Sequence, residues 1–102
     1  MEPSNSVVRR FVAALNAGDR LAFFAALTSD ATMSDDGVDR NLREWAEEEI
    51  FASKGHMAVQ SEAADGLSLI AVNSNATWGK MRTKWRFVLR GELIGRFETG
   101  QA

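Results

Sequence analysis

The chain has 102 residues, a net charge of −2 and an apolar fraction of 45%, which together indicate one globular domain over residues 1–102. A near-neutral chain lacks the positive charge of a nucleic-acid or anionic-membrane binder, so neither partner is expected. The absence of cysteine excludes disulfides and thiolate metal sites, and the single histidine argues against a histidine-built metal centre.

The first part of the chain carries apolar residues at the three- and four-residue spacing of amphipathic helices. Either Ser4 or Ser6 is expected to cap the first helix, and Gly18 is expected to end it in a left-handed conformation. Asp19 is then expected to cap a short second helix that ends at Leu27.

A third helix is predicted over residues 42–53, after a short extended segment at 31–34. Asn41 and Glu44 have the spacing of a capping box, in which Asn41 caps the helix and Glu44 reaches back to the Asn41 amide. The acidic run 47–49 is interpreted as a solvated helix face.

The second half of the chain alternates between apolar and polar residues, which is typical of strands with one buried face. Turn signals divide it into four strands, expected at 57–63, 67–78, 81–89 and 93–98, with a bulge at 73–75. Three helices followed by a mostly antiparallel four-strand meander predict an α+β fold. Long strands coil, so the sheet is expected to curve strongly, to hold the helices in its concave face and to enclose a central apolar pocket.

The sequence has no dinucleotide-binding, Walker A, nucleophile-elbow or zinc-protease motif, so no cofactor and no metal are expected. Asp35 follows the extended segment at the rim of the expected pocket. A carboxylate at the mouth of an apolar pocket takes up a proton more readily than one in water, and can act as a general base. Alternatively, Asp35, Asp36 and Gly37 form a polar turn. The lone His56 precedes the first long strand and is interpreted as a surface residue rather than a catalytic one.

Four segments carry a resemblance to a known family: FVAALNAGD at 11–19, LTSDAT at 27–32, TKWRF at 83–87 and IGRFE at 94–98. Their order and spacing resemble the nuclear transport factor 2-like superfamily, in particular its bacterial SnoaL-like and ketosteroid isomerase-like branch. The resemblance implies a cone of three helices in a curved sheet, with a deep pocket for a small hydrophobic molecule. It also implies a homodimer formed through the outer face of the sheet.

The resemblance to ketosteroid isomerases is incomplete at the catalytic positions. The general-base aspartate of those enzymes corresponds to Asp35. The tyrosine that stabilises the oxyanion falls on Phe11, which has no hydroxyl, and the second donor, an aspartate, falls on Thr83. Oxyanion donors contribute about 3–4 kcal/mol each to the transition state, so ordinary ketosteroid isomerisation is not expected.

Two functional hypotheses follow. In the first, Asp35 removes a proton next to a carbonyl, as in an isomerase or a polyketide cyclase, and Thr83 donates a hydrogen bond. The pocket would then be lined by the apolar residues Phe11, Phe24, Met33, Trp45 and Trp85. In the second, the chain is a non-catalytic, dimeric ligand-binding or assembly domain, these side chains are core, and Asp35 is a turn residue.

Outward-facing charges bear on the assembly of the protein, and the hydropathy of the chain bears on its location. One sheet face carries a basic row, and Glu62 and Glu98 are placed to pair with it from neighbouring strands or from a partner subunit; the row consists of Arg82, Lys84, Arg86 and Arg90. The polar start of the chain has no apolar h-region, and the longest apolar run, 21–27, is too short to span a membrane. A cytoplasmic protein is therefore expected, and the homodimer is expected mainly because the resemblance implies it.

Overall fold

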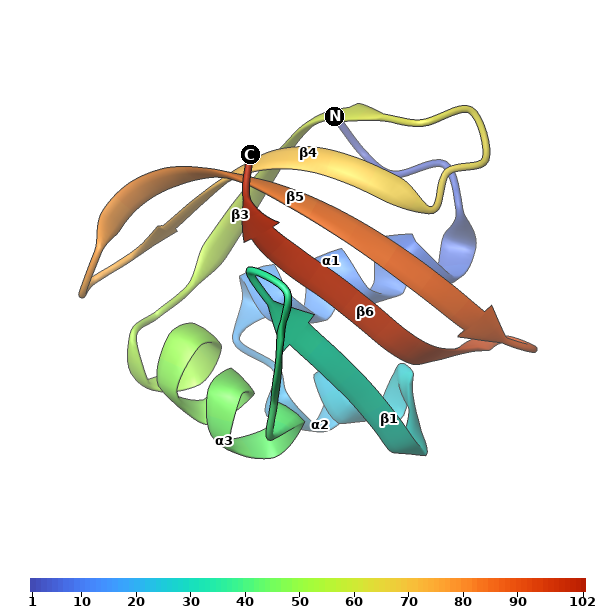
Figure 1. Ribbon diagram of the computed structural model, residues 1–102, viewed down its shortest axis with the longest axis horizontal. Coiled ribbons are helices and arrows are strands. Elements are labelled where there is room, and N and C mark those ends of the chain that lie inside the picture. The colour runs from blue at the N-terminus through green and yellow to red at the C-terminus, as the bar shows by residue number, and fades with distance from the viewer.

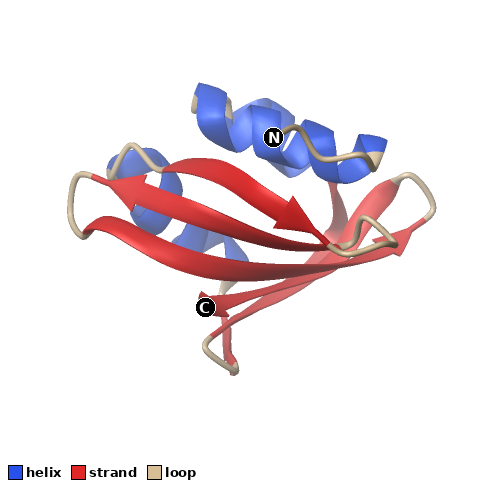
Figure 2. Cartoon of the chain, turned by 90° about the horizontal axis from the view of Figure 1, so that it is seen from above, coloured by secondary structure: helices blue, strands red, loops and turns tan.

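The two periodicities of the sequence separate into two layers in the computed structural model, which describes residues 1–102 (Figure 1). Helices gather on one side of a curved six-stranded sheet (Figure 2). The elements in chain order are α1 (Ser6–Ala17), α2 (Arg20–Ala25), β1 (Leu27–Asp35), β2 (Val38–Arg40), α3 (Leu42–Ala46), the π-helix η1 (Glu47–Ala52), β3 (His56–Glu62), β4 (Ser68–Asn75), β5 (Gly79–Arg90) and β6 (Leu93–Gln101). The α+β prediction is confirmed, and no helix is long and apolar enough to cross a bilayer.

Side-chain caps delimit the helices largely as the sequence predicts. Gly18 ends α1 with a φ of 64°, and Asp19 caps α2 by accepting from the Ala22 amide at 3.0 Å. The N-cap of α1 is Asn5 rather than a neighbouring serine, because its Oδ1 accepts from two amides of the first turn. Asn41 caps α3 through the Glu44 amide at 3.0 Å, and α3 continues into η1 to give the predicted third helix.

The four predicted strands are present as the antiparallel meander β3–β4–β5–β6. The four-strand count is wrong, because the sheet contains two further strands in the order β2-β1-β6-β5-β4-β3. β1 pairs in parallel with β6, so it covers the outer edge of the meander, and it forms a hairpin with β2. The extended segment predicted at 31–34 is therefore the end of a nine-residue strand, whose free backbone groups find partners on β6.

The bulge predicted at 73–75 is also wrong. β4 and β5 pair without interruption from Ser68 opposite Arg86 to Asn75 opposite Gly79. Asn75 instead builds the turn between these strands, because its Oδ1 accepts from the Trp78 amide at 2.6 Å. The register shift of this part of the sheet lies in β3, between Val59 and Ser61.

The centre of the inner face is filled by aromatic side chains. Phe11 of α1 is fully buried, and its ring centroid lies 4.9–5.9 Å from four other rings; these belong to Phe23, Trp85, Phe87 and Phe97. Met33 of β1 is also fully buried in this cluster. The space left for a ligand therefore lies at one end of the sheet and not at its centre.

Candidate functional site

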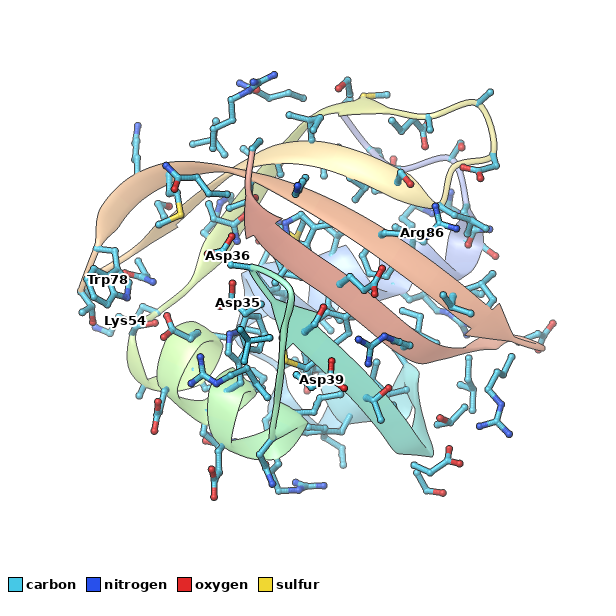
Figure 3. All side chains as sticks on the ribbon, viewed as in Figure 1. Asp35, Asp36, Asp39, Lys54, Trp78 and Arg86 are labelled. Carbon is cyan, nitrogen blue, oxygen red and sulfur yellow. The ribbon has the colours of Figure 1, made fainter.

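A cavity of about 270 Å³ lies between α3–η1 and the inner face of β4, β5 and β6. Residues from the ends of β1, β4 and β6 line it, and Figure 3 shows Asp35 and Asp36 at the tip of β1, above α3. The β4–β5 turn is held over the cavity because the Ala76 amide donates to the Ser53 carbonyl at 2.7 Å. Gly55 lets the chain leave η1 close to the backbone of that helix, because a Cβ at this position would lie 2.9 Å from the Glu49 carbonyl oxygen.

Asp35 lines this cavity and is half-buried at the end of β1. It lies opposite Thr99 in the parallel pairing with β6, which places its side chain on the inner face. Its Oδ2 accepts a hydrogen bond from Trp45 Nε1 at 3.0 Å. The tight turn that follows is made by Asp36 and Gly37, with φ values of 49° and 80°.

Thr83 also lines the cavity, but its hydroxyl is already engaged by neighbouring side chains. Its Oγ1 donates to Asn73 Oδ1 at 2.6 Å and accepts from Trp85 Nε1 at 2.9 Å. Since the oxygen of Asn73 is held in this way, its NH₂ group is the part of the network left to donate to a ligand.

The five apolar residues predicted to bind a ligand fall into three places. Trp45 and Trp85 form walls of the cavity, with ring centroids 6.3 Å apart. Phe11 and Met33 lie in the packed core, outside the cavity lining. Phe24 borders a separate surface depression, where the Arg43 guanidinium lies 4.3 Å from its ring centroid. The structure therefore brings Asp35 and Thr83 together with the two tryptophans alone.

Several residues that line the cavity are not predicted from the sequence. Thr99 is 8% exposed, and its hydroxyl, which solvent can still reach, makes no hydrogen bond within the chain. Its place between Asp35 and Trp85 depends on two strand pairings, one of them the unpredicted parallel one. Trp78 is 66% exposed on the β4–β5 turn at the cavity mouth. Its only sequence signal was a large aromatic next to a turn glycine.

The acidic run on η1 is not a uniform solvated face. Glu47 binds Arg20 through two hydrogen bonds of 2.6 and 2.7 Å, and these bonds hold the pKa of the Glu47 carboxyl below its usual value. Glu48 is exposed, whereas Glu49 is half-buried and lines the cavity. Three consecutive glutamates on one helix turn therefore have three different surroundings: an ion pair, solvent and the cavity.

The outer face of the sheet carries a larger hollow of about 780 Å³. Lys84 and Arg86 lie in it, and neither forms an ion pair (Figure 3 labels Arg86). Glu98 forms an ion pair with Arg96, and Arg90 forms one with Asp30. The Glu62 carboxylate accepts a hydrogen bond from the Ser4 hydroxyl. Because this hollow mixes exposed charges of both signs, the inner cavity has the better-defined chemistry.

No group of three or more acidic, histidine or cysteine side chains in residues 1–102 is arranged to hold a metal ion. His56 is exposed at the start of β3, away from the cavity lining.

Comparison with known proteins gives matches among solved structures. No family model and no curated protein matches the sequence. A candidate polyketide cyclase from Sinorhizobium meliloti is 20% identical, with 93% of this chain and 94% of that chain covered and a TM-score of 0.75. A protein of unknown function from Cytophaga hutchinsonii, described as NTF2-like, is 16% identical over 100% of this chain and 92% of that chain, with a TM-score of 0.80.

A third similar structure is the orange carotenoid protein of Anabaena with bound canthaxanthin. It is 17% identical, with a TM-score of 0.73, and the match covers 96% of this chain but 36% of that protein. Identities at this level establish a shared fold and leave the chemistry to be argued from the site itself.

Proposed function

We propose, from the nuclear transport factor 2-like fold that this chain has, that the protein binds a small, largely apolar molecule in the cavity beside Asp35. The convergence of two indole walls with free hydrogen-bonding groups carries the proposal. Trp45 and Trp85 supply the walls, and the Thr99 hydroxyl and the Asn73 NH₂ group supply the polar contacts. Small-molecule sites have this composition: apolar walls and a few converging polar groups.

The cavity volume restricts the size of the ligand. About 270 Å³ is just below the lower end of drug-sized sites, about 300 Å³, and corresponds to roughly nine water molecules of liquid. A molecule with one or two rings fits this volume. A four-ring steroid needs a larger cavity than this one, and Phe11 offers no oxyanion donor, so ordinary steroid isomerisation is not supported.

Intrinsic fluorescence tests the binding site directly, because all three tryptophans of the chain line the cavity. Cyclohexylmethanol is a suitable probe, since it fits the volume and does not absorb where indole does. A saturable fluorescence change is expected, and Thr99→Val should weaken binding about fivefold by removing one hydrogen bond. The matched control is Thr77→Val on the exposed turn, which should bind as the wild type does. No saturable change in the wild type would refute the site.

Asp35 is the candidate general base within this function. Its Oδ2 accepts from Trp45, which leaves Oδ1 to take a proton from a carbon next to a ligand carbonyl. Thr83 is then a positioning residue, since it holds Asn73 by its oxygen and leaves the NH₂ group to donate to the developing oxyanion. Proton removal by Asp35 can be tested separately from ligand binding.

Deuterium exchange into cyclohexanone in D₂O, followed by NMR, provides that test. The wild type should accelerate exchange at the α-carbon, and Asp35→Asn should lose the acceleration while keeping its affinity for cyclohexylmethanol. Glu48→Gln removes an exposed charge nearby and should exchange like the wild type. No acceleration by the wild type would contradict the base role and leave ligand binding standing.

A non-catalytic, dimeric binding or assembly domain is the second candidate. It is favoured by the Thr83 hydroxyl proton, which points to Asn73 and so is not free for a ligand. It is also favoured by the unpaired basic side chains on the outer face of the sheet. Sedimentation velocity at micromolar protein should show a homodimer; a monomer at every concentration would refute that assembly.

A further inference from the structure

The charged groups around the cavity are all of one sign. Three carboxylates line it, those of Asp35, Asp36 and Glu49, and no lysine, arginine or histidine does. The chain as a whole is nearly balanced, with 12 basic and 14 acidic residues, so this local excess is not a reflection of composition. Lys54, which Figure 3 shows at the edge of the molecule, is outside the cavity lining.

None of the three carboxylates has a cationic partner. Every ion pair of the chain involves other acidic residues, namely Glu2, Asp30, Asp39, Glu47 and Glu98. Asp35 accepts one indole N–H, Asp36 accepts the Gln101 amide at 2.9 Å, and the carboxylate of Glu49 accepts no hydrogen bond. The negative charge at the cavity is therefore only partly satisfied within the chain, and two of its bearers are half-buried.

The other cavity groups complement a cation. Thr99 is more than nine-tenths buried, lies opposite Asp35, and presents an unpartnered hydroxyl whose oxygen can accept from an ammonium group. The indole N–H groups of Trp45 and Trp85 donate to Asp35 and Thr83, so a ligand contacts these side chains through their aromatic rings. Trp78 adds a third ring at the mouth, and indole faces attract cations.

We propose that the ligand of this cavity is a small protonated amine with an apolar body. The body packs against the indoles, and the ammonium group binds between the carboxylates and the Thr99 hydroxyl. This inference rests on the proposed ligand-binding function and narrows its ligand class. A metal ion does not explain the same carboxylates, because their arrangement does not form a metal site and the walls are aromatic.

Three probes of the same shape separate charge from apolar burial: cyclohexylmethylamine, cyclohexylmethanol and cyclohexanecarboxylate. Titrated at pH 7 by tryptophan fluorescence, the amine should bind at least tenfold more tightly than the alcohol, which is about 1.4 kcal/mol. The carboxylate should bind more weakly than the alcohol. Added salt should weaken the amine and leave the alcohol unchanged.

Two variants locate the charge that is responsible. Glu49→Gln should weaken the amine about fivefold and leave the alcohol unchanged, because only the Coulomb attraction is removed. Glu48→Gln changes the same charge on the same turn outside the cavity, and should bind both probes as the wild type does.

The outcomes distinguish this inference from the function on which it rests. Equal binding of amine and alcohol, or tighter binding of the carboxylate, would overturn the amine assignment and leave the binding site intact. Loss of amine affinity in Glu48→Gln equal to that in Glu49→Gln would also overturn it, since a diffuse surface charge would then be responsible. Failure of all three probes would overturn both.

Discussion

The inner face of the sheet has two regions that are built from the same aromatic side chains and differ in what completes them. Around Phe11, rings contact other rings on every side, and the space is closed. Beside Asp35, the rings of Trp45 and Trp85 meet carboxylate, amide and hydroxyl groups, and a cavity remains. Aromatic content therefore does not mark the site; the site begins where polar groups interrupt the packing.

Replacing the ring at the centre should give the largest effect. Phe11→Ala should cost about 3–5 kcal/mol of the free energy of unfolding, because the ring is fully buried and touches four others. Urea denaturation measures this loss. At urea concentrations where the Phe11→Ala variant is still folded, its affinity for cyclohexylmethylamine should equal that of the wild type. A lower affinity in the folded variant would show that the two regions form a single site.

Removing the hydrogen bond between Asp35 and Trp45 tests the open region. Trp45→Phe keeps an aromatic ring but leaves Asp35 without its indole donor, and should cost about 1–2 kcal/mol. Unlike Phe11→Ala, it should also change ligand affinity. In combination with Asp35→Asn the losses should be less than additive, since both substitutions break one bond. Full additivity would show that the bond contributes nothing.

The smallest effect is expected at the α2–η1 ion pair, where Glu47 can be compared with Glu49. The bonds to Arg20 lower the pKa of Glu47 in the folded protein, so the pair stabilises the fold above the usual value of 4.5 and is lost as the pH falls below it. Between pH 5 and pH 3 the thermal stability of Glu47→Gln should therefore fall less than that of the wild type. The difference should be small, because the ion pair is exposed. It should not change amine binding at pH 7, whereas Glu49→Gln should.

The parts of the fold that depend on local chemistry could be predicted. Helix caps at Asp19 and Asn41, the left-handed Gly18 and the alternation along β5 follow from short-range hydrogen bonds and from side-chain periodicity. β1 could be predicted only in part, because its pairing joins residues 64 positions apart, such as Thr32 and Arg96. A mostly polar strand carries no local signal for a parallel partner.

The candidate site divides in the same way. Asp35 is predicted from its position after an extended segment at the rim of the expected pocket and from the family resemblance, and Thr83, Trp45 and Trp85 are predicted from their faces and from that resemblance. The sequence does not distinguish Glu49 from Glu47. The two side chains leave the helix in different directions, and only the neighbouring elements decide that one faces Arg20 and the other faces the cavity. Thr99 was missed because its role depends on strands at both of its sides.

The sequence by itself determined the helices and the four-stranded antiparallel meander, since periodicity, caps and turn residues specify each of them. The tertiary structure decided which aromatic side chains close the core and which leave a cavity, and which acidic side chains are paired. Those outcomes depend on volumes and charges that meet across distant segments, where close packing permits one arrangement and no short stretch of chain encodes it.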